Sequence, residues 1–209
     1  MLDFFTACIH LDPIGIIKAG GYLGLAVLVF AESGLLVGIF LPGDSLLFVA
    51  GLLAAGGFLE PLSLTFIVVG AAILGDSVGY WFGTRIGSAL FTRKDSRFFK
   101  QAYVARTQGF FETYGGRAII LARFVPIVRT IAPILAGVGS MRYTRFLSYN
   151  ALGGVLWGAG VILLGYSLGS VIPNSDKYVL PISLGIIILS FSPLLLNLVR
   201  GKSKRLTRQ

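Results

Sequence analysis

Charge, cysteine and histidine are all scarce in this sequence of 209 residues. Asp, Glu, Lys and Arg occupy only 13% of positions, well below the roughly 25% of a soluble globular protein. With a mean hydropathy of +0.83, this composition excludes a disordered chain and predicts an all-α polytopic membrane protein. Cys8 is the single cysteine, which excludes a disulfide scaffold. His10 is the single histidine, so we expect no histidine-based metal site or triad, no metal and no cofactor.

The charge that is present is mostly basic, with 18 Lys and Arg against 9 Asp and Glu. Seven basic residues lie between Arg85 and Arg117, and five between Arg200 and Arg208. Both clusters flank apolar runs, so they indicate cytoplasmic anchors beside an anionic leaflet and not a nucleic-acid partner.

Four apolar stretches are long enough to cross a bilayer, which takes about 20 residues: 16–40, 61–84, 146–170 and 178–199. Two further stretches are not. Residues 45–59 form a run of only 15, and 118–141 is interrupted by two arginines and by Pro126 and Pro133. Proline removes a helix hydrogen bond, and freed backbone groups are tolerated at membrane depth only inside protein or a wet cavity. We therefore expect two re-entrant hairpins, at 40–59 and 118–141.

These segments predict a single membrane domain over 1–209, with a first repeat at 16–84 and a second at 118–175. Cytoplasmic N- and C-termini satisfy the positive-inside rule if the first span exits and the second returns. Residues 85–117 then form a cytoplasmic segment with an interfacial amphipathic helix, followed later by the final span 178–199 and a basic cytoplasmic tail, 200–209. A helix packed on its neighbours is an equal alternative for the amphipathic segment.

The two interrupted stretches resemble each other in sequence. Phe40-Leu-Pro42 is followed by Ala50-Gly51, and Phe124-Val-Pro126 by Ala136-Gly137. In the expected topology the two units enter from opposite sides, which makes an inverted repeat. Broken helices of such repeats commonly build a site near the midplane.

Two basic groups lie in apolar surroundings, where a charge costs roughly 2.5 kcal/mol or more. Arg123 and Arg129 flank Pro126, and a helix break there lets both guanidinium groups reach one ligand. Guanidinium forks suit phosphate oxygens, so one interpretation is a phosphate-binding pair. Structural pairing with buried acids is the alternative.

Three acids lie in the same apolar stretches. Glu32 and Asp44 are candidates for proton coupling, because burial and a nearby arginine act on a carboxyl in opposite directions. Alternatively, Glu32 is a fixed counter-ion and Asp44 caps a helix that starts at Ser45. Asp76 lies among glycines spaced every four residues from 75 to 87, which favours close helix packing over chemistry. We expect it to pair with an arginine.

These motifs resemble the DedA family of membrane proteins, whose shared region is the VTT or SNARE-associated domain. The resemblance rests on four stretches and covers about 20–200: Glu32-Ser33-Gly34, Phe40-Leu-Pro-Gly-Asp-Ser-Leu-Leu-Phe48, Gly75-Asp76 with Gly79-Tyr80, and Arg123-Phe-x-Pro-x-x-Arg129 with Pro133 and Ala136-Gly137. It implies an essential acid pair, Glu32 and Asp44, and an essential arginine pair, Arg123 and Arg129. Pro42, Gly43, Asp76, Pro126 and Pro133 are expected to support them.

The resemblance also implies a lipid transporter or flippase of the bacterial inner membrane. Its expected cargo is undecaprenyl phosphate or a related anionic phospholipid, moved at the expense of the proton-motive force. We therefore expect a lipid phosphate and protons as partners and no enzymatic activity. Two alternatives remain open: a non-transporting homeostasis or assembly factor, and an intramembrane lipid-pyrophosphate phosphatase, for which the sequence offers no positioned base or metal ligands.

Overall fold

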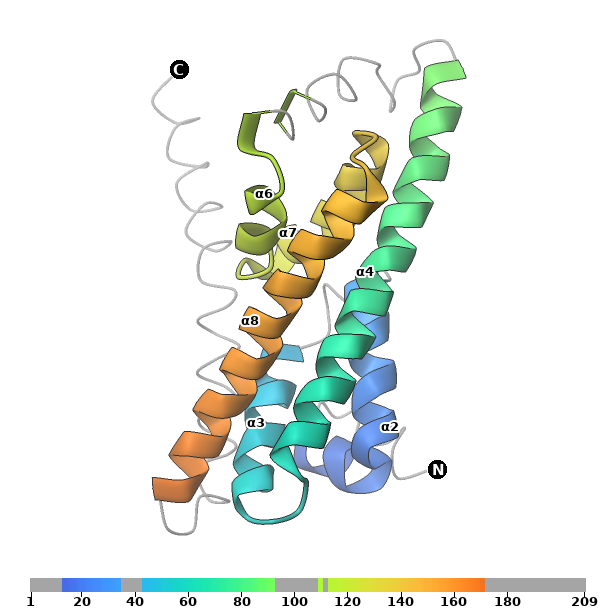
Figure 1. Cartoon of the computed structure of the whole chain (residues 1–209). Helices are drawn as coiled ribbons and strands as arrows, with labels where there is room; N and C mark the ends of the chain where they lie inside the picture. The colour runs from blue at the N-terminus through green and yellow to red at the C-terminus, as the bar shows by residue number, and fades with distance from the viewer. Residues whose placement is uncertain (1–12, 35–42, 93–108, 111–112, 172–209) are drawn as a thin grey trace, which may run out of the picture.

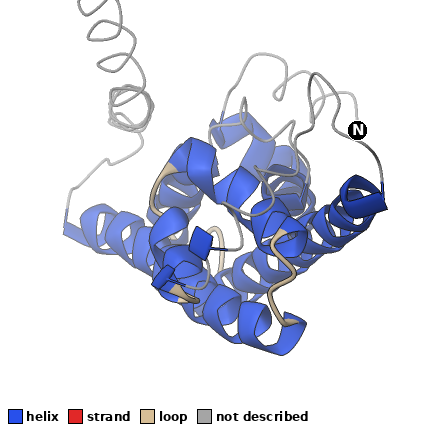
Figure 2. Ribbon diagram, turned by 90° about the horizontal axis from the view of Figure 1, so that it is seen from above, coloured by secondary structure: helices blue, strands red, loops and turns tan. Residues whose placement is uncertain are grey.

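The computed structural model describes residues 13–34, 43–92, 109–110 and 113–171, and this part of the chain contains helices and no strand (Figures 1 and 2). The principal helices are α2 (Pro13–Gly34), α3 (Gly43–Ala55), α4 (Pro61–Thr92), α6 (Arg117–Ala122), α7 (Pro126–Val138) and α8 (Tyr143–Val171). Three segments are long and apolar enough to cross a membrane: Ile14–Gly34, Pro61–Ile86 and Tyr143–Val171. The all-helical membrane architecture is therefore confirmed at this level.

The expected spans correspond to these helices only in part. α4 and α8 contain the expected spans 61–84 and 146–170, although α4 continues to Thr92 into the expected cytoplasmic segment. α2 ends at Gly34, and the rest of the expected span 16–40 lies outside the described residues. The final span 178–199, the basic tail and most of the amphipathic segment also lie outside them.

The order of the first helices differs from the expected topology. α2 is kinked at Gly21, whose backbone angles are not helical. Just after this kink, Tyr22 Oη accepts from the backbone N–H of Glu60 at 2.7 Å, immediately before the start of α4. Further along, Gly34 of α2 lies against the backbone of Gly75 in α4. The two helices therefore run parallel. The expectation that the first two spans cross the membrane in opposite directions is wrong. Hydropathy measures the length of an apolar run but not the direction of its helix.

The packing of α3 on α8 is repeated by the packing of α7 on α4. In the first pair, a Cβ at Gly51 would lie 2.2 Å from the Ile162 carbonyl oxygen, and a Cβ at Gly165 would lie 2.1 Å from that of Phe48. Such distances are far too short for a side chain, so the two backbones touch through their glycines.

The second pair follows the same rule, with Gly137 against the Tyr80 carbonyl and Gly83 against the Ile134 carbonyl, each at 2.1 Å for a notional Cβ. Gly51 and Gly137 are the glycines of the two Ala-Gly pairs in the sequence repeat. Each short helix thus packs on the long helix of the other half, with α3 toward one end of the molecule and α7 toward the other (Figure 1).

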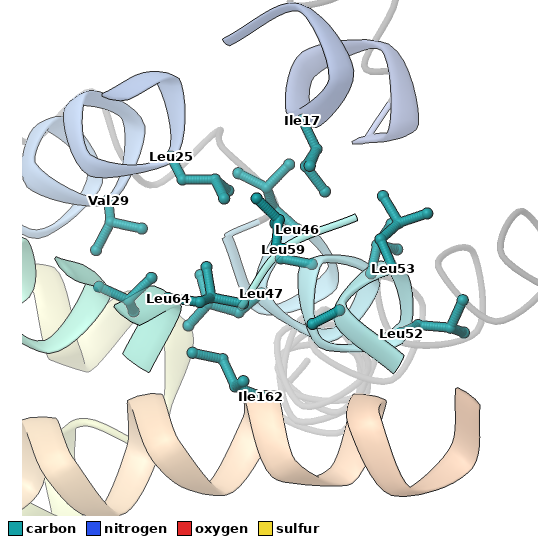
Figure 3. Close-up of a cluster of buried hydrophobic side chains, with 14 of the residues drawn as sticks. Ile17, Leu25, Val29, Leu46, Leu47, Leu52, Leu53, Leu59, Leu64 and Ile162 are labelled. Atoms are coloured by element: carbon teal, nitrogen blue, oxygen red, sulfur yellow. The ribbon is translucent and has the colours of Figure 1, made fainter. Parts of the chain in front are cut away.

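Apolar side chains from four helices meet around α3 (Figure 3). Leu25 of α2, Leu47 and Val49 of α3, Leu64 of α4 and Ile162 of α8 are fully buried in one cluster. Large apolar side chains that remain exposed, among them Leu23, Phe66 and Leu164, are the residues expected to face lipid tails in a protein of this composition.

Proline and Glu60 set the starts of two helices. Pro126 is the first residue of α7, after an extended Val125, so the predicted break there is confirmed. Pro133 lies inside α7 without ending it, so the expectation that both prolines break the helix is wrong at this position. At α4, the Glu60 carboxylate accepts from the backbone N–H groups of Ser63 (2.5 Å) and Leu62 (2.9 Å). The Ser63 side chain, followed by these two N–H groups, lowers the pKa of Glu60 below its ordinary 4.5.

Candidate functional site: buried ion pairs between the two short helices

The first turns of α3 and α7 face each other, and an ion pair joins them. Arg129 Nη1 donates to Asp44 Oδ1 at 2.6 Å. The same guanidinium donates through Nη2 to Glu32 Oε1, from α2. One arginine is therefore shared between two carboxylates from two other helices. With all three groups ionised, one positive and two negative charges give this cluster a net charge of −1.

The exposure of these groups is graded. Glu32 is 3% exposed, whereas the side chains of Arg129 and Asp44 are 11% and 23% exposed. A buried charge is tolerated only when it is paired and hydrogen-bonded, and these pairings meet that condition. Asp44 and Arg129 form the accessible side of the cluster, and Glu32 forms its closed side.

Gly43 makes room for Glu32. A Cβ at position 43 would lie 1.6 Å from Glu32 Oε2, so any other residue would displace the carboxylate. The Gly43 backbone also hydrogen-bonds to Glu32 at the first residue of α3. The positive end of the α3 dipole and the Arg129 guanidinium thus hold the same carboxylate.

A second ion pair lies beside the first. Arg123 Nη1 donates to Asp76 Oδ2 and, at 2.6 Å, to Asn150 Oδ1. Arg123 and Asp76 are 5% and 3% exposed. A Cβ at Gly153 would stand 3.5 Å from Arg123 Cδ, so this arginine packs directly against the α8 backbone. The pair links α4 to α8 through the loop that follows α6.

Trp157 of α8 connects the two pairs. Its indole Nε1 donates to Asp44 Oδ1 at 2.9 Å. The Cζ atoms of Arg123 and Arg129 lie 5.4 and 4.9 Å from its ring centroid, within range of a cation–π contact. Sequence reasoning missed both Trp157 and Asn150. A tryptophan and an asparagine deep inside an apolar run, away from the membrane interfaces where Trp is usual, were the available signals.

The structure thus brings the five charged candidates together, in two groups. Glu32 and Asp44 share Arg129, and Asp76 does pair with an arginine, as expected from the sequence. Asp44 lies within α3, which starts at Gly43, and accepts from two side chains, so the alternative that it caps a helix starting at Ser45 is wrong. Pro42 lies outside the described residues. Within the described ranges no cluster of His, Cys, Asp and Glu suits a metal ion.

Comparison with known proteins places this geometry in a family context. The family model of the VTT domain matches residues 41–167. The chain is 48% identical to the uncharacterized membrane protein Rv0364 of Mycobacterium tuberculosis, over 91% of the chain and 86% of the relative. It is 43% identical to Protein DedA of Escherichia coli K12 (87% and 83%) and 35% identical to the inner membrane protein YqjA of the same strain (75% and 71%). No solved structure gives a significant match.

Proposed function

The chain belongs to the DedA family of VTT-domain membrane proteins, and we propose that it translocates a lipid phosphate across the bacterial inner membrane. The proposed cargo is undecaprenyl phosphate or a related anionic phospholipid. The observation that carries the proposal is Arg129, a buried guanidinium shared by two carboxylates where two short helices begin. A permanently charged fork inside an apolar bundle suits an anionic headgroup.

We take the stretches 40–59, which contains α3, and 118–141, which contains α7, to be re-entrant hairpins that enter from opposite sides. Thirteen residues of helix, the length of α3 and of α7, extend about 20 Å. The hydrocarbon core is about 30 Å thick, so neither short helix can cross it. The repeated glycine packing supports this arrangement, and Asp44 and Arg129 would then lie near mid-membrane.

The distribution of arginines supports an orientation. Arg85, Arg117, Arg142 and Arg145 are exposed at the end where α4 finishes and α8 starts, so the positive-inside rule assigns this end to the cytoplasm. The start of α2 then lies at the opposite, outer end. The N-terminus, expected in the cytoplasm, lies outside the described residues. The cytoplasmic C-terminus stays a prediction.

In the proposed mechanism the phosphate competes with the two carboxylates for Arg129. Both terminal nitrogens of this guanidinium already donate to acids, so a phosphate gains them only when the acids are neutralised or displaced. A proton on Glu32 or Asp44 removes one competing negative charge. Protons entering from the outer side would thus favour phosphate binding, and their release to the cytoplasm would favour its departure.

Arg123 has a supporting part in this proposal. Asp76 and Asn150 hold its Nη1, whereas its Nε is buried without a hydrogen-bond partner among the described residues. We propose that this Nε donates to a headgroup held at Arg129 while the ion pair of Arg123 stays intact. The polyprenyl or acyl tail would remain in the lipid.

Transport in proteoliposomes tests the proposal. Labelled undecaprenyl phosphate is placed in one leaflet, a pH gradient is imposed, and a membrane-impermeant quencher reports the label that crosses. We expect Arg129→Ala to abolish gradient-driven transport and Arg129→Lys to reduce it, because lysine keeps the charge but loses the two-pronged geometry. Arg142→Ala, at an exposed arginine, is the matched control and should transport normally. Normal transport by Arg129→Ala would reject the proposal.

The same preparations separate the other two functions. A non-transporting assembly factor would tolerate neutral residues at Glu32 and Arg129 but not large residues at Gly79 or Gly83, which pack on α7. A phosphatase would release phosphate from the lipid pyrophosphate, which we do not expect.

A further inference from the structure

Trp157 donates to the same carboxylate oxygen as Arg129. Its Nε1 lies 2.9 Å from Asp44 Oδ1, and Arg129 Nη1 lies 2.6 Å from that oxygen. Trp157 is 4% exposed, so its indole N–H has little access to water. Whatever takes the place of Asp44 Oδ1 must therefore accept from both donors, because a buried donor left unpaired is destabilising.

The indole face also fixes the direction of the guanidinium. Arg129 Cζ lies 4.9 Å from the ring centroid, and Arg123 Cζ lies 5.4 Å from it. Both guanidinium groups thus lie within cation–π range of one indole ring of α8, although they pair with different carboxylates.

An indole N–H donates but cannot accept, and it carries no charge. Beside Arg129 it makes a pair of donors aimed at one oxygen, one charged and one neutral. A phosphate oxygen accepts from both. A protonated carboxyl is a weaker acceptor for both, so neutralising Asp44 frees the two donors together.

We propose that Trp157 is a binding and positioning residue of this site. Its indole N–H, which donates to Asp44 in the free protein, donates to an oxygen of the lipid phosphate in the complex, while its ring holds Arg129 in place. This inference rests on the proposed function and extends it to a residue outside the acid and arginine pairs. The ligand class is a phosphate monoester on a lipid.

Fluorescence offers a direct test, because the chain has only two tryptophans. Trp81 is 58% exposed on α4, away from the ion pairs, and contacts Arg85. In a Trp81→Phe protein, Trp157 is the sole tryptophan reporter. We expect its emission to change saturably with farnesyl phosphate and not with farnesol, and to lose this response in the additional variant Arg129→Ala. If the Trp81→Phe protein transports the lipid but its tryptophan emission does not change with farnesyl phosphate, the inference is overturned.

Transport kinetics supply the second test. Trp157→Phe keeps an aromatic face but removes the N–H, whereas Trp157→Leu removes both. The N–H exchanges a bond to a protonated Asp44 for a stronger one to a charged phosphate, a difference of about 1 kcal/mol. We therefore expect Trp157→Phe to raise the half-saturating lipid concentration about fivefold, with a smaller effect on the maximal rate. Trp157→Leu should lose more.

The outcomes separate the two proposals. If wild-type protein transports the lipid but Trp157→Phe has unchanged half-saturation, the role of Trp157 is overturned and the proposed function stands. If wild-type protein neither transports nor binds the lipid phosphate, the proposed function fails, and this inference fails with it.

Discussion

The contact between α3 and α8 leaves no room for a methyl group at Gly165. A Cβ there would lie 2.1 Å from the Phe48 carbonyl oxygen, whereas ordinary contact begins at 3.4 Å. The shortfall is 3.4 − 2.1 = 1.3 Å, and the obstacle is backbone, which cannot rotate away. Gly165→Ala must therefore push the two helices apart.

Gly160 in the same helix provides the control, since a Cβ there meets nothing within 4 Å. Gly160→Ala should stabilise α8 by up to about 1 kcal/mol through helix propensity. Overpacking at position 165 should cost about 1–3 kcal/mol. Gly165→Ala gains the same helix propensity, so the two variants should differ by the overpacking cost, about 1–3 kcal/mol or about 2–12 °C in Tm for a chain of this size.

Thermal unfolding of detergent-purified protein, followed by gel filtration of the fraction that stays folded, measures this difference. Gly83→Ala should behave like Gly165→Ala, because Gly83 makes the equivalent contact with the Ile134 carbonyl in the other half. Equal melting temperatures for Gly165→Ala and Gly160→Ala would refute the packing scheme.

Three further predictions concern the ion pairs and the α4 cap. Gly43→Ala should abolish gradient-driven transport and lower Tm, since the new methyl displaces the buried Glu32 carboxylate from Arg129; normal transport would contradict this. Asp76→Ala should destabilise the protein by about 3–5 kcal/mol, and adding Arg123→Ala should recover part of the loss in a thermal double-mutant cycle; strict additivity would contradict it. Glu60→Gln should lower Tm at neutral pH, and the difference should vanish as the pH falls below 4.5, because a lowered folded-state pKa stabilises only the ionised form; a constant difference in a pH series of melts would contradict it.

The membrane class and the family were available from the sequence. Scarce charge and long apolar runs predict the helices α4 and α8, and Pro126 marks the start of α7 because a proline ring fits the first turn of a helix and not its middle. Pro133 shows the limit of that rule, since the packing of α7 against α4 accommodates it inside the helix.

The candidate site was also predictable from the sequence only in part. The sequence identified Glu32, Asp44, Asp76, Arg123 and Arg129, because a charge inside an apolar run is costly wherever the chain places it. Which acid meets which arginine depends on residues 47 to 97 positions apart in the chain, and no local pattern encodes such distances.

The tertiary structure alone decided the direction of α2 and the position of Trp157 between the ion pairs. It also decided that each short helix packs on the long helix of the other half. Hydropathy and spacing act along the chain and fix what each segment can do. The close approach of glycine backbones and the pairing of buried charges act between distant segments, and they select one arrangement of those segments.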